Sequence, residues 1–249
     1  MEERRRAILA YLVTHTRATV EELNDLFPGT SAMTIRRDLD HLEQEGEVIR
    51  IHGGAMLNPA RTLQEAQYGV REVENRDEKA RIATLAVQHL GDTRSIYIDA
   101  GTTCMEFARR LSGSGLLVTT SGANIAAELA GRNPDMTVTM LGGSLNPRSL
   151  AVSGSQSIAQ VQNINIDTAV MCTSGYAPGA GFSNGHIGES ELKRAVIAKA
   201  RRVILLMDGT KLGRTLPYTF ARPEDVDLII CDRNPGDAAV GIPEEKIVY

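Results

Sequence analysis

Short polar side chains gather directly after several apolar runs in this chain of 249 residues. The segment DAGTT (99–103) begins where the run SIYI ends, and TTS (119–121) closes the run LLVTT. Glycine lets a backbone approach a ligand closely, threonine and serine offer hydroxyl groups, and the start of a helix offers free N–H groups. Residues of these types in this order suit the binding of a phosphate group or another anion.

Charged side chains at comparable positions extend this candidate ligand site. Arg148 comes shortly after a third run and a Gly-Gly pair, and Lys211 follows another apolar run. Glu189 and Lys193 are spaced to share one face of a helix. Cations beside a hydroxyl-rich loop would suit a phosphorylated sugar. The candidate effector-binding residues are Asp99, Gly101, Thr102, Thr103, Thr120, Ser121, Arg148, Glu189, Lys193 and Lys211.

Each of these features also has a simpler structural explanation. Gly-Thr-Thr after a strand often only caps a helix, and Glu189 with Lys193 would also make a surface ion pair. Cys104 begins a helix, where a thiolate is favoured, but we expect a buried structural cysteine there. No spacing of His, Cys and Asp matches a metal site. We therefore expect no metal, no other cofactor and no catalytic residue.

A parallel sheet would bring these polar groups to one edge. Apolar runs of strand length occur at 95–99, 116–120, 136–141, 167–173, 202–208 and 226–232, and helical stretches separate several of them. Strands that alternate with helices predict a largely parallel sheet with helices on both faces. Ligands of such sheets bind at the carboxyl ends of the strands. We assign this α/β domain to residues 77–249 and a linker that passes into a helix to residues 58–76.

A second constellation lies in residues 31–44, where two adjacent arginines occur on a periodic helix. Ser31 can cap this helix, and Ile35, Leu39 and Leu42 face a core. Met33, Arg36, Arg37, Asp40 and Gln44 lie toward the opposite side. Asp38 falls near the core-facing side, which favours a structural ion pair over base reading.

The surrounding elements of residues 1–57 suit a winged helix-turn-helix. One helix carries apolar residues at 8, 9, 12 and 13, and Thr19 with Glu22 has capping-box spacing at the start of the next. Residues 48–51 have strand propensity, and Gly53-Gly54 permits a tight return. The second helix of such a pair enters the major groove, where arginine can bind guanine. The candidate DNA-binding residues are Ser31, Met33, Thr34, Arg36, Arg37, Arg50 and His52, the last two able to reach phosphates or the minor groove. The alternatives are a small helical bundle with a solvated arginine face and a helix-turn-helix that docks proteins.

Composition limits the remaining possibilities. The formal net charge of −4 argues against an indiscriminate nucleic-acid coat. Residues 1–57 hold seven arginines against ten acidic residues, so a single DNA-binding head should bind weakly. We therefore expect a homo-oligomer, a dimer or a tetramer, on repeated half-sites. No run is long enough for a membrane helix, and three widely spaced cysteines suggest a reducing compartment, the cytoplasm.

Residues 31–55 resemble the DNA-binding domain of the DeoR family of bacterial transcriptional regulators. The family pattern S-x-x-T-I-R-R-D-L-x-x-L-E-x-x-G followed by R-x-H-G-G-A matches here from Ser31 to Ala55. The turn FPGTS is one residue longer than the common spacing. The later segments D-x-G-T-T (99–103), L-G-G with P-R-S-L and a following Gly (141–154), E-x-x-x-K (189–193) and D-x-[ST]-K (208–211) resemble the DeoR C-terminal sensor domain.

The resemblance implies a Rossmann-like sensor, similar in fold to sugar-phosphate isomerases, that responds to phosphorylated sugars or related intermediates. It implies a regulator bound to a double-stranded operator, typically a repressor of a carbohydrate operon. Where many relatives have A-D-G, this chain has Thr173-Ser174-Gly175. The alternatives are an isomerase that uses Asp99 or Glu189 as a base, and a regulator that senses an unphosphorylated sugar or a partner protein. The effector, the operator sequence and the direction of the response stay open.

Overall fold

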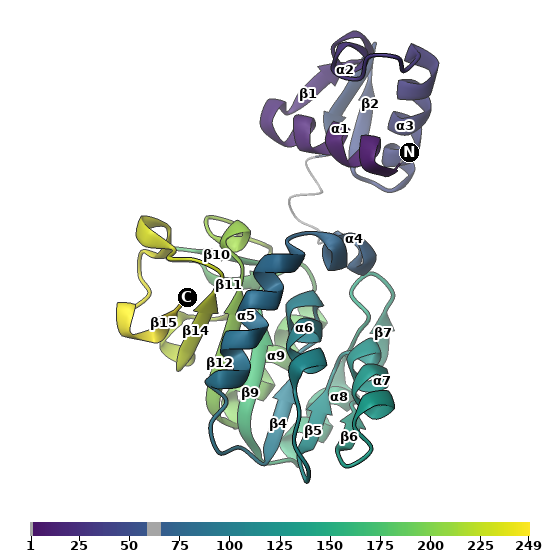
Figure 1. Ribbon diagram of the computed structural model, residues 1–249. Helices are drawn as coiled ribbons and strands as arrows, with labels where there is room; N and C mark the ends of the chain where they lie inside the picture. The colour runs from purple at the N-terminus through teal and green to yellow at the C-terminus, as the bar shows by residue number, and fades with distance from the viewer. Residues whose placement is uncertain (1, 59–65) are drawn as a thin grey trace. The chain divides into compact units, whose positions relative to one another are not determined.

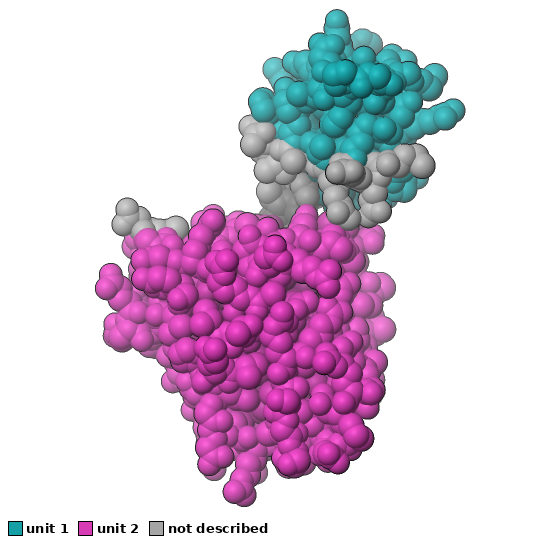
Figure 2. Space-filling view, viewed as in Figure 1, with its two compact units in different colours: residues 1–64 teal, residues 65–249 magenta. Residues whose placement is uncertain are grey.

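The computed structural model describes residues 2–58 and 66–249 and divides the chain into two compact units. The first unit comprises Met1–Gln64 and the second comprises Glu65–Tyr249 (Figure 2). Each unit has its own buried hydrophobic core, the smaller one in the first unit. None of the helices within the described ranges combines the length and the apolar character needed to cross a bilayer.

The first unit contains three helices, α1 (Glu2–His15), α2 (Val20–Leu26) and α3 (Ala32–Gln44). The predicted capping box of α2 is confirmed, because the Glu22 amide donates to Thr19 Oγ1 at 3.1 Å and the Thr19 amide donates to Glu22 Oε2 at 2.7 Å. Ser31 caps α3, and its Oγ accepts from the Thr34 amide at 3.2 Å. Ile35, Leu39 and Leu42 are buried, as the spacing predicts.

A small antiparallel sheet completes the winged helix-turn-helix. Strands β2 (Val48–Ile51) and β3 (Gly54–Leu57) form the predicted ribbon, and β1 (Arg17–Thr19) pairs with β3. The sequence did not predict β1, because three residues show no alternation. Gly54 fits only as glycine, since a Cβ there would lie 2.1 Å from the carbonyl oxygen of Ala18. The fold class predicted for this part of the chain is confirmed.

The second unit is built on a seven-stranded sheet in which every neighbouring pair is parallel. Its strand order is β15-β14-β12-β9-β4-β5-β6. The strands are β4 (Ser95–Ile98), β5 (Leu117–Thr120), β6 (Thr137–Met140), β9 (Ile166–Cys172), β12 (Ala200–Met207), β14 (Leu228–Cys231) and β15 (Ile247–Val248).

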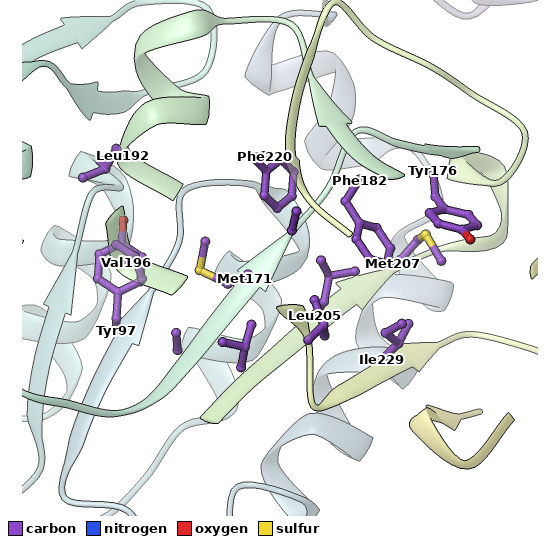
Figure 3. Close-up of a cluster of buried hydrophobic side chains, with 14 of the residues drawn as sticks. Tyr97, Met171, Tyr176, Phe182, Leu192, Val196, Leu205, Met207, Phe220 and Ile229 are labelled. Carbon is purple, nitrogen blue, oxygen red and sulfur yellow. The ribbon is translucent and has the colours of Figure 1, made fainter. Parts of the chain in front are cut away.

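Helices cover both faces of this sheet, as the alternation of runs predicts (Figure 1). Helices α5 (Arg76–Gln88), α6 (Thr102–Arg110) and α7 (Ala123–Arg132) pack on one face, and α8 (Ser155–Gln162) and α9 (Ile187–Lys199) pack on the other. Successive strand residues point to opposite faces. Val170 therefore joins the core between the sheet and helices α5, α6 and α7. Ala169 and Met171 join the core between the sheet and helices α8 and α9, which Figure 3 shows in close-up.

Several short elements lie outside the seven-stranded sheet, and the sequence did not predict them. Strands β7 (Ser144–Asn146) and β8 (Ala151–Ser153) form a hairpin, and β10 (Gly175–Ala177), β11 (Gly181–Asn184) and β13 (Tyr218–Ala221) form a small antiparallel sheet. The 3₁₀ turns are η2 (Gly209–Lys211), η3 (Pro223–Asp225), η4 (Gly236–Ala239) and η5 (Glu244–Lys246). The segment between β9 and α9, for which the sequence predicted no element, thus contains paired strands.

The start of the second unit differs from the sequence prediction of a linker over 58–76. Helix α4 (Tyr68–Val73) lies inside that range, its Tyr68 is buried, and the Tyr68 amide donates to the Arg148 carbonyl at 2.7 Å. Lys79 of α5 donates to the Glu74 carbonyl at 2.6 Å. Residues 68–76 therefore belong to the second unit, and six helical residues are too few to show a period. Residues 59–65 of the predicted linker lie outside the described residues.

Candidate functional site

A buried ion pair forms the centre of the candidate effector site. Asp99 follows β4, Lys193 lies on α9, and the two side chains pair with only 3% and 6% of each residue exposed. The Lys193 ammonium also donates to the Cys172 carbonyl at 2.9 Å, and the Cys172 amide donates to Asp99 Oδ2 at 3.1 Å. The ends of β4 and β9 and the middle of α9 are thereby held together at one point.

The charges of this pair stabilise each other. Burial alone would lower the pKa of Lys193, but the Asp99 carboxylate outweighs that effect and holds the pKa above its ordinary value. The ring of Phe220 lies 4.9 Å from the ammonium group, in the arrangement of a cation–π contact. Lys193 is therefore a fixed positive charge at neutral pH.

The start of α6 lies beside this ion pair. Gly101 is its N-cap residue, with φ of 141°, and provides no side-chain cap. A Cβ at Gly101 would lie 2.6 Å from Cys172 Sγ, so this position needs glycine for space as well as for its backbone conformation. The first N–H groups of a helix have no partner within the helix and carry positive partial charge. With the hydroxyls of Thr102 and Thr103, they form an arrangement that can accept an anion.

Glu189 connects α9 to the β7–β8 hairpin. Its Oε1 accepts from Asn146 Nδ2 at 2.9 Å and from Ser149 Oγ at 2.6 Å. The carboxylate is nearly buried, at 8% exposure of the residue, and lies one turn before Lys193. The alternative of a surface ion pair between Glu189 and Lys193 is wrong, because Lys193 pairs with Asp99 instead.

Thr120 and Ser121 close β5 and are buried. Thr120 Oγ1 accepts from the Gly122 amide at 3.0 Å, and Ser121 Oγ accepts from the Tyr97 hydroxyl at 2.9 Å. Burial raises the pKa of Tyr97, which keeps its hydroxyl protonated as a donor. The two predicted hydroxyls thus already hold structural partners.

Arg148 and Lys211 differ from the other predicted effector residues. Arg148 is exposed, and its backbone connects the hairpin to α4 through Tyr68. Lys211 follows β12 and lies 3.4 Å from Asp208 Oδ2, a buried carboxylate oxygen without a hydrogen-bond partner.

Hydrogen bonds and the Asp99–Lys193 pair connect the ends of β4, β5 and β9 with α9. Lys211 belongs to a separate group of contacts at the end of β12.

Several residues around the site were not assigned to it from the sequence. Asn146 and Ser149 hold Glu189, and Cys172 contacts both members of the ion pair. Tyr68 and Asn124 each bury a polar oxygen that has no hydrogen-bond partner. Asn146 and Ser149 lie in the segment LNPRSL that the sequence singled out, so proximity to Arg148 was a usable signal. No such signal in the sequence pointed to Tyr68, because it lies in the predicted linker.

Three side chains of this region offer possible metal ligands. The ligand atoms of Asp99, Cys104 and Cys172 all lie within 4.8 Å of one another. The Lys193 ammonium already occupies the cation position next to Asp99. We therefore assign no metal to this cluster.

A depression of about 460 Å³ lies at the opposite edge of the sheet. Its lining comes from the turn after α5 and the first residues of β9 and β12, and includes Arg94, Asp167, Arg201 and Arg202. None of the predicted effector residues lines it. Ligands of parallel sheets bind at the carboxyl edge, so we keep the candidate site there.

The candidate DNA-binding surface lies on α3 and the wing. Met33, Arg36 and Arg37 are exposed on one side of α3. Asp38 points inward and pairs with Arg4 at 2.6 Å and with Arg5 at 3.3 Å, which confirms its predicted structural role. Ser31 and Thr34 hydrogen-bond to each other at the start of the helix, through side-chain oxygens 2.9 Å apart.

The two predicted wing residues have different surroundings. His52 is exposed at the turn between β2 and β3. Arg50 is half-buried, with its Nε 3.3 Å from Asp40 Oδ1 and its guanidinium donating to the Gly54 carbonyl at 3.3 Å. Arg50 thus holds the wing against α3, so a DNA phosphate would have to compete with Asp40 for it.

Both units match protein-family models. A DeoR-like helix-turn-helix domain matches residues 4–61, and a DeoR C-terminal sensor domain matches residues 74–233. The chain belongs to the DeoR family. It is a transcriptional regulator with a DNA-binding head and a sensor domain, as the sequence resemblance implies.

Curated DeoR-type relatives align along almost the whole chain. The HTH-type transcriptional regulator GlpR of Haloferax volcanii is 35% identical over 92% of this chain and 89% of its own. The HTH-type transcriptional repressor GlcR of Bacillus subtilis is 33% identical over 95% and 90%, respectively. The glycerol-3-phosphate regulon repressor of Escherichia coli is 28% identical over 94% and 91%.

A solved ribose 5-phosphate isomerase A from Methanocaldococcus jannaschii also aligns with this DeoR-family chain. The identity is 16%, the alignment covers 58% of this chain and 56% of the enzyme, and the TM-score is 0.39. We draw no conclusion about activity from a likeness at this level.

Proposed function

We propose that this DeoR-family regulator represses genes of carbohydrate use and releases its operator when a phosphorylated sugar binds the sensor. The names of two relatives, a glycerol-3-phosphate regulon repressor and a repressor called GlcR, support repression. The observation that carries the effector class is the buried Asp99–Lys193 pair beside the uncapped start of α6. It combines a fixed carboxylate with an anion-accepting helix terminus.

The groups of the site divide between the two halves of such a ligand. The phosphate would take the free N–H groups at the start of α6 and the hydroxyls of Thr102 and Thr103. The sugar hydroxyls would donate to the carboxylates of Asp99 and Glu189. Lys193 stays paired with Asp99, and the exposed Arg148 side chain would contact the phosphate at the rim. We infer that Lys211 acts as a second, outer cation rather than as a direct neighbour of Lys193.

Release of the operator requires that the ligand prefer one state of the protein, because an effector shifts an equilibrium only by its differential affinity. The β7–β8 hairpin supports a route for this preference. Glu189 contacts its residues Asn146 and Ser149, and Arg148 holds α4 through the Tyr68 amide. A ligand that displaces Glu189 or Arg148 would therefore also displace α4, the first helix of the second unit.

On the DNA side, we propose that α3 enters the major groove. Met33, Arg36 and Arg37 would face base edges, while Ser31, Thr34 and His52 would contact the backbone. A single head has few positive charges, so we infer that two or more copies of the chain bind repeated half-sites.

Isomerase activity is not part of this proposal. Proton transfer between sugar carbons needs a free carboxylate base. Asp99 is ion-paired with Lys193, and Glu189 already accepts two hydrogen bonds. We infer that both carboxylates accept hydrogen bonds from a ligand and do not act as the base of an isomerase.

Calorimetric titration of the full-length protein tests the effector class. A panel of pentose, hexose and triol phosphates is compared with the same compounds without phosphate. We expect one phosphorylated compound to bind and its unphosphorylated form not to bind. Thr102→Ala should weaken binding about tenfold, since it removes a hydrogen bond to a charged group. Thr84→Ala, an exposed threonine on α5, is the matched control and should bind normally. Equal binding of both forms would contradict the proposal.

A further inference from the structure

Two cysteines meet next to the Asp99–Lys193 pair. Cys104 lies on α6, Cys172 ends β9, and their sulfur atoms and the Asp99 carboxylate lie within 4.8 Å of one another. The Cys104 thiol donates to the Val170 carbonyl at 3.8 Å. The Cys172 thiol also lies 3.1 Å from the Ala100 carbonyl oxygen and 3.5 Å from Asp99 Oδ2. Neither thiol is needed for the effector contacts proposed above.

The two thiols differ in their access to solvent. Cys104 is fully buried, and burial raises the pKa of its thiol. Cys172 is partly exposed and has the Lys193 ammonium bound to its own carbonyl. Cysteines that react with oxidants are accessible and have a cation close by, whereas buried cysteines in apolar surroundings are inert. The Asp99 carboxylate beside the Cys172 sulfur is itself paired with Lys193. Cys172 is therefore the thiol that an oxidant can reach, and Cys104 is its internal partner.

We propose that Cys104 and Cys172 form a covalent modification site, a dithiol that a peroxide oxidises to an intramolecular disulfide. The third cysteine, Cys231, is buried on β14 and takes no part.

The reaction balances with one peroxide. The Cys172 thiolate attacks one oxygen of hydrogen peroxide, the O–O bond breaks, and the hydroxide that leaves takes up a proton to become water. Cys172 is then a sulfenic acid. The sulfur of Cys104 attacks the Cys172 sulfur, the S–O bond breaks, and the proton of Cys104 leaves with the hydroxide as a second water. Two thiols are oxidised by two electrons, and the peroxide is reduced to two waters.

Formation of this bond would change the effector site. A disulfide needs its sulfur atoms about 2.05 Å apart, so Cys172 Sγ would leave its contacts with Ala100 and Asp99. Gly101 packs so closely on Cys172 Sγ that a Cβ there would be 2.6 Å away. Movement of this sulfur would therefore displace the start of α6. This consequence rests on the proposed function, whereas the bond itself does not.

Mapping of the thiols in the full-length protein tests the site. The reduced protein is treated with hydrogen peroxide, free thiols are blocked, and the products are analysed by intact mass and by peptide mapping. We expect a species that has lost two hydrogen atoms, with the Cys104 and Cys172 peptides joined and Cys231 still free. Reduction should restore the original mass.

Three variants sharpen the result. Cys172→Ser should abolish the bond, and Cys104→Ala should leave Cys172 as a sulfenic or sulfinic acid. Cys231→Ala, the matched control, should form the bond as the unchanged protein does, because burial that raises the Cys231 pKa to about 12 keeps it unreactive. A bond that includes Cys231, oxidation of Cys172 without a bond to Cys104 in the unchanged protein, or unreacted thiols would each overturn the proposal. The assay contains neither DNA nor a sugar phosphate, so its outcome is independent of the proposed regulatory function.

Discussion

The interactions of single residues explain how charges are held in the candidate effector site. Asp99 and Lys193 are almost completely buried, and each is the ionic partner of the other. Removal of one member of a buried pair leaves an uncompensated charge, which costs more than the pair itself contributes. Substitution of either residue should therefore affect stability as well as the proposed ligand binding.

Asp99→Asn should destabilise the second unit by about 3 kcal/mol, since it leaves the Lys193 ammonium without a counter-charge in a buried place. Hydrogen exchange of the amides in β4 and β9 measures the free energy of unfolding of this unit separately from the first. Arg201→Ala is the control, because it breaks an ion pair with Asp167 in which the Arg201 side chain is 82% exposed. Its effect should stay below about 1 kcal/mol. Equal effects of the two variants would contradict this account.

Lys79 gives the second unit a dependence on pH. Burial and the nearby Lys211 ammonium lower the pKa of Lys79 from 10.5 to about 8. Between these two values the unfolded chain holds a proton that the folded protein has released, so the free energy of unfolding rises with pH. The full contribution is on the order of 3 kcal/mol. Denaturation of the unchanged protein and of Lys79→Met across this range should give different slopes, and equal slopes would contradict the assignment.

The positions of the candidate site residues at strand ends were predicted from the sequence better than their contacts were. Asp99, Gly101, Thr102 and Thr103 follow an obvious strand, so their place at a strand end could be read directly. The sequence cannot show that Asp99 pairs with Lys193, because that contact depends on how α9 packs against the sheet. It also could not separate Lys211 from the rest, since strand order decides which strand ends are neighbours.

At the scale of elements, the position of α3 depends on one buried carboxylate. Asp38 accepts from Arg4 and Arg5 of α1, so it holds the helix that we propose to enter DNA against the rest of the first unit. Asp40, two residues later, pairs with Arg50 of the wing while its own side chain is 58% exposed. Asp38 and Asp40 thus both form ion pairs with arginine, but the Asp38 side chain is buried and the Asp40 side chain is exposed.

Asp38→Ala should destabilise the first unit by about 2 kcal/mol, because it removes hydrogen bonds to charged groups at a buried position. Asp40→Ala should cost less than about 1 kcal/mol. Hydrogen exchange of the amides in α1 and α3 reports both values. A loss of stability in Asp40→Ala that matches the loss in Asp38→Ala would mean that burial does not decide the strength of these pairs.

The longer elements were predictable and the shorter ones were not, for a physical reason. α3 shows its period over three turns, and β9 is an apolar run buried on both faces. The strands β1, β7, β8 and β10 have three residues each, and β1 pairs with β3 across almost forty positions of the chain, as Arg17 opposite Met56 shows. Pairing at such separation leaves no local pattern. α4 is missed for the same reason, since its fixing contact, Tyr68 with Arg148, is distant in sequence.

At the scale of the whole molecule, a DNA-binding unit and a sensor unit are joined in one chain. Seven arginines against ten acidic residues in the first 57 positions give one head little electrostatic affinity for DNA. The proposed oligomer supplies that affinity by binding several half-sites at once. The sensor can then control DNA binding by changing how well two heads fit their half-sites together.

A mobility-shift titration tests whether this protein binds an operator under the control of a sugar phosphate. The full-length protein is titrated against DNA from upstream of its own gene and of neighbouring carbohydrate genes, with and without each sugar phosphate. We expect saturable, sequence-selective binding that one sugar phosphate weakens and that Arg36→Ala with Arg37→Ala abolishes. Selective binding that no sugar phosphate changes would contradict the proposed effector class. The absence of selective binding under every condition would contradict the account as a whole.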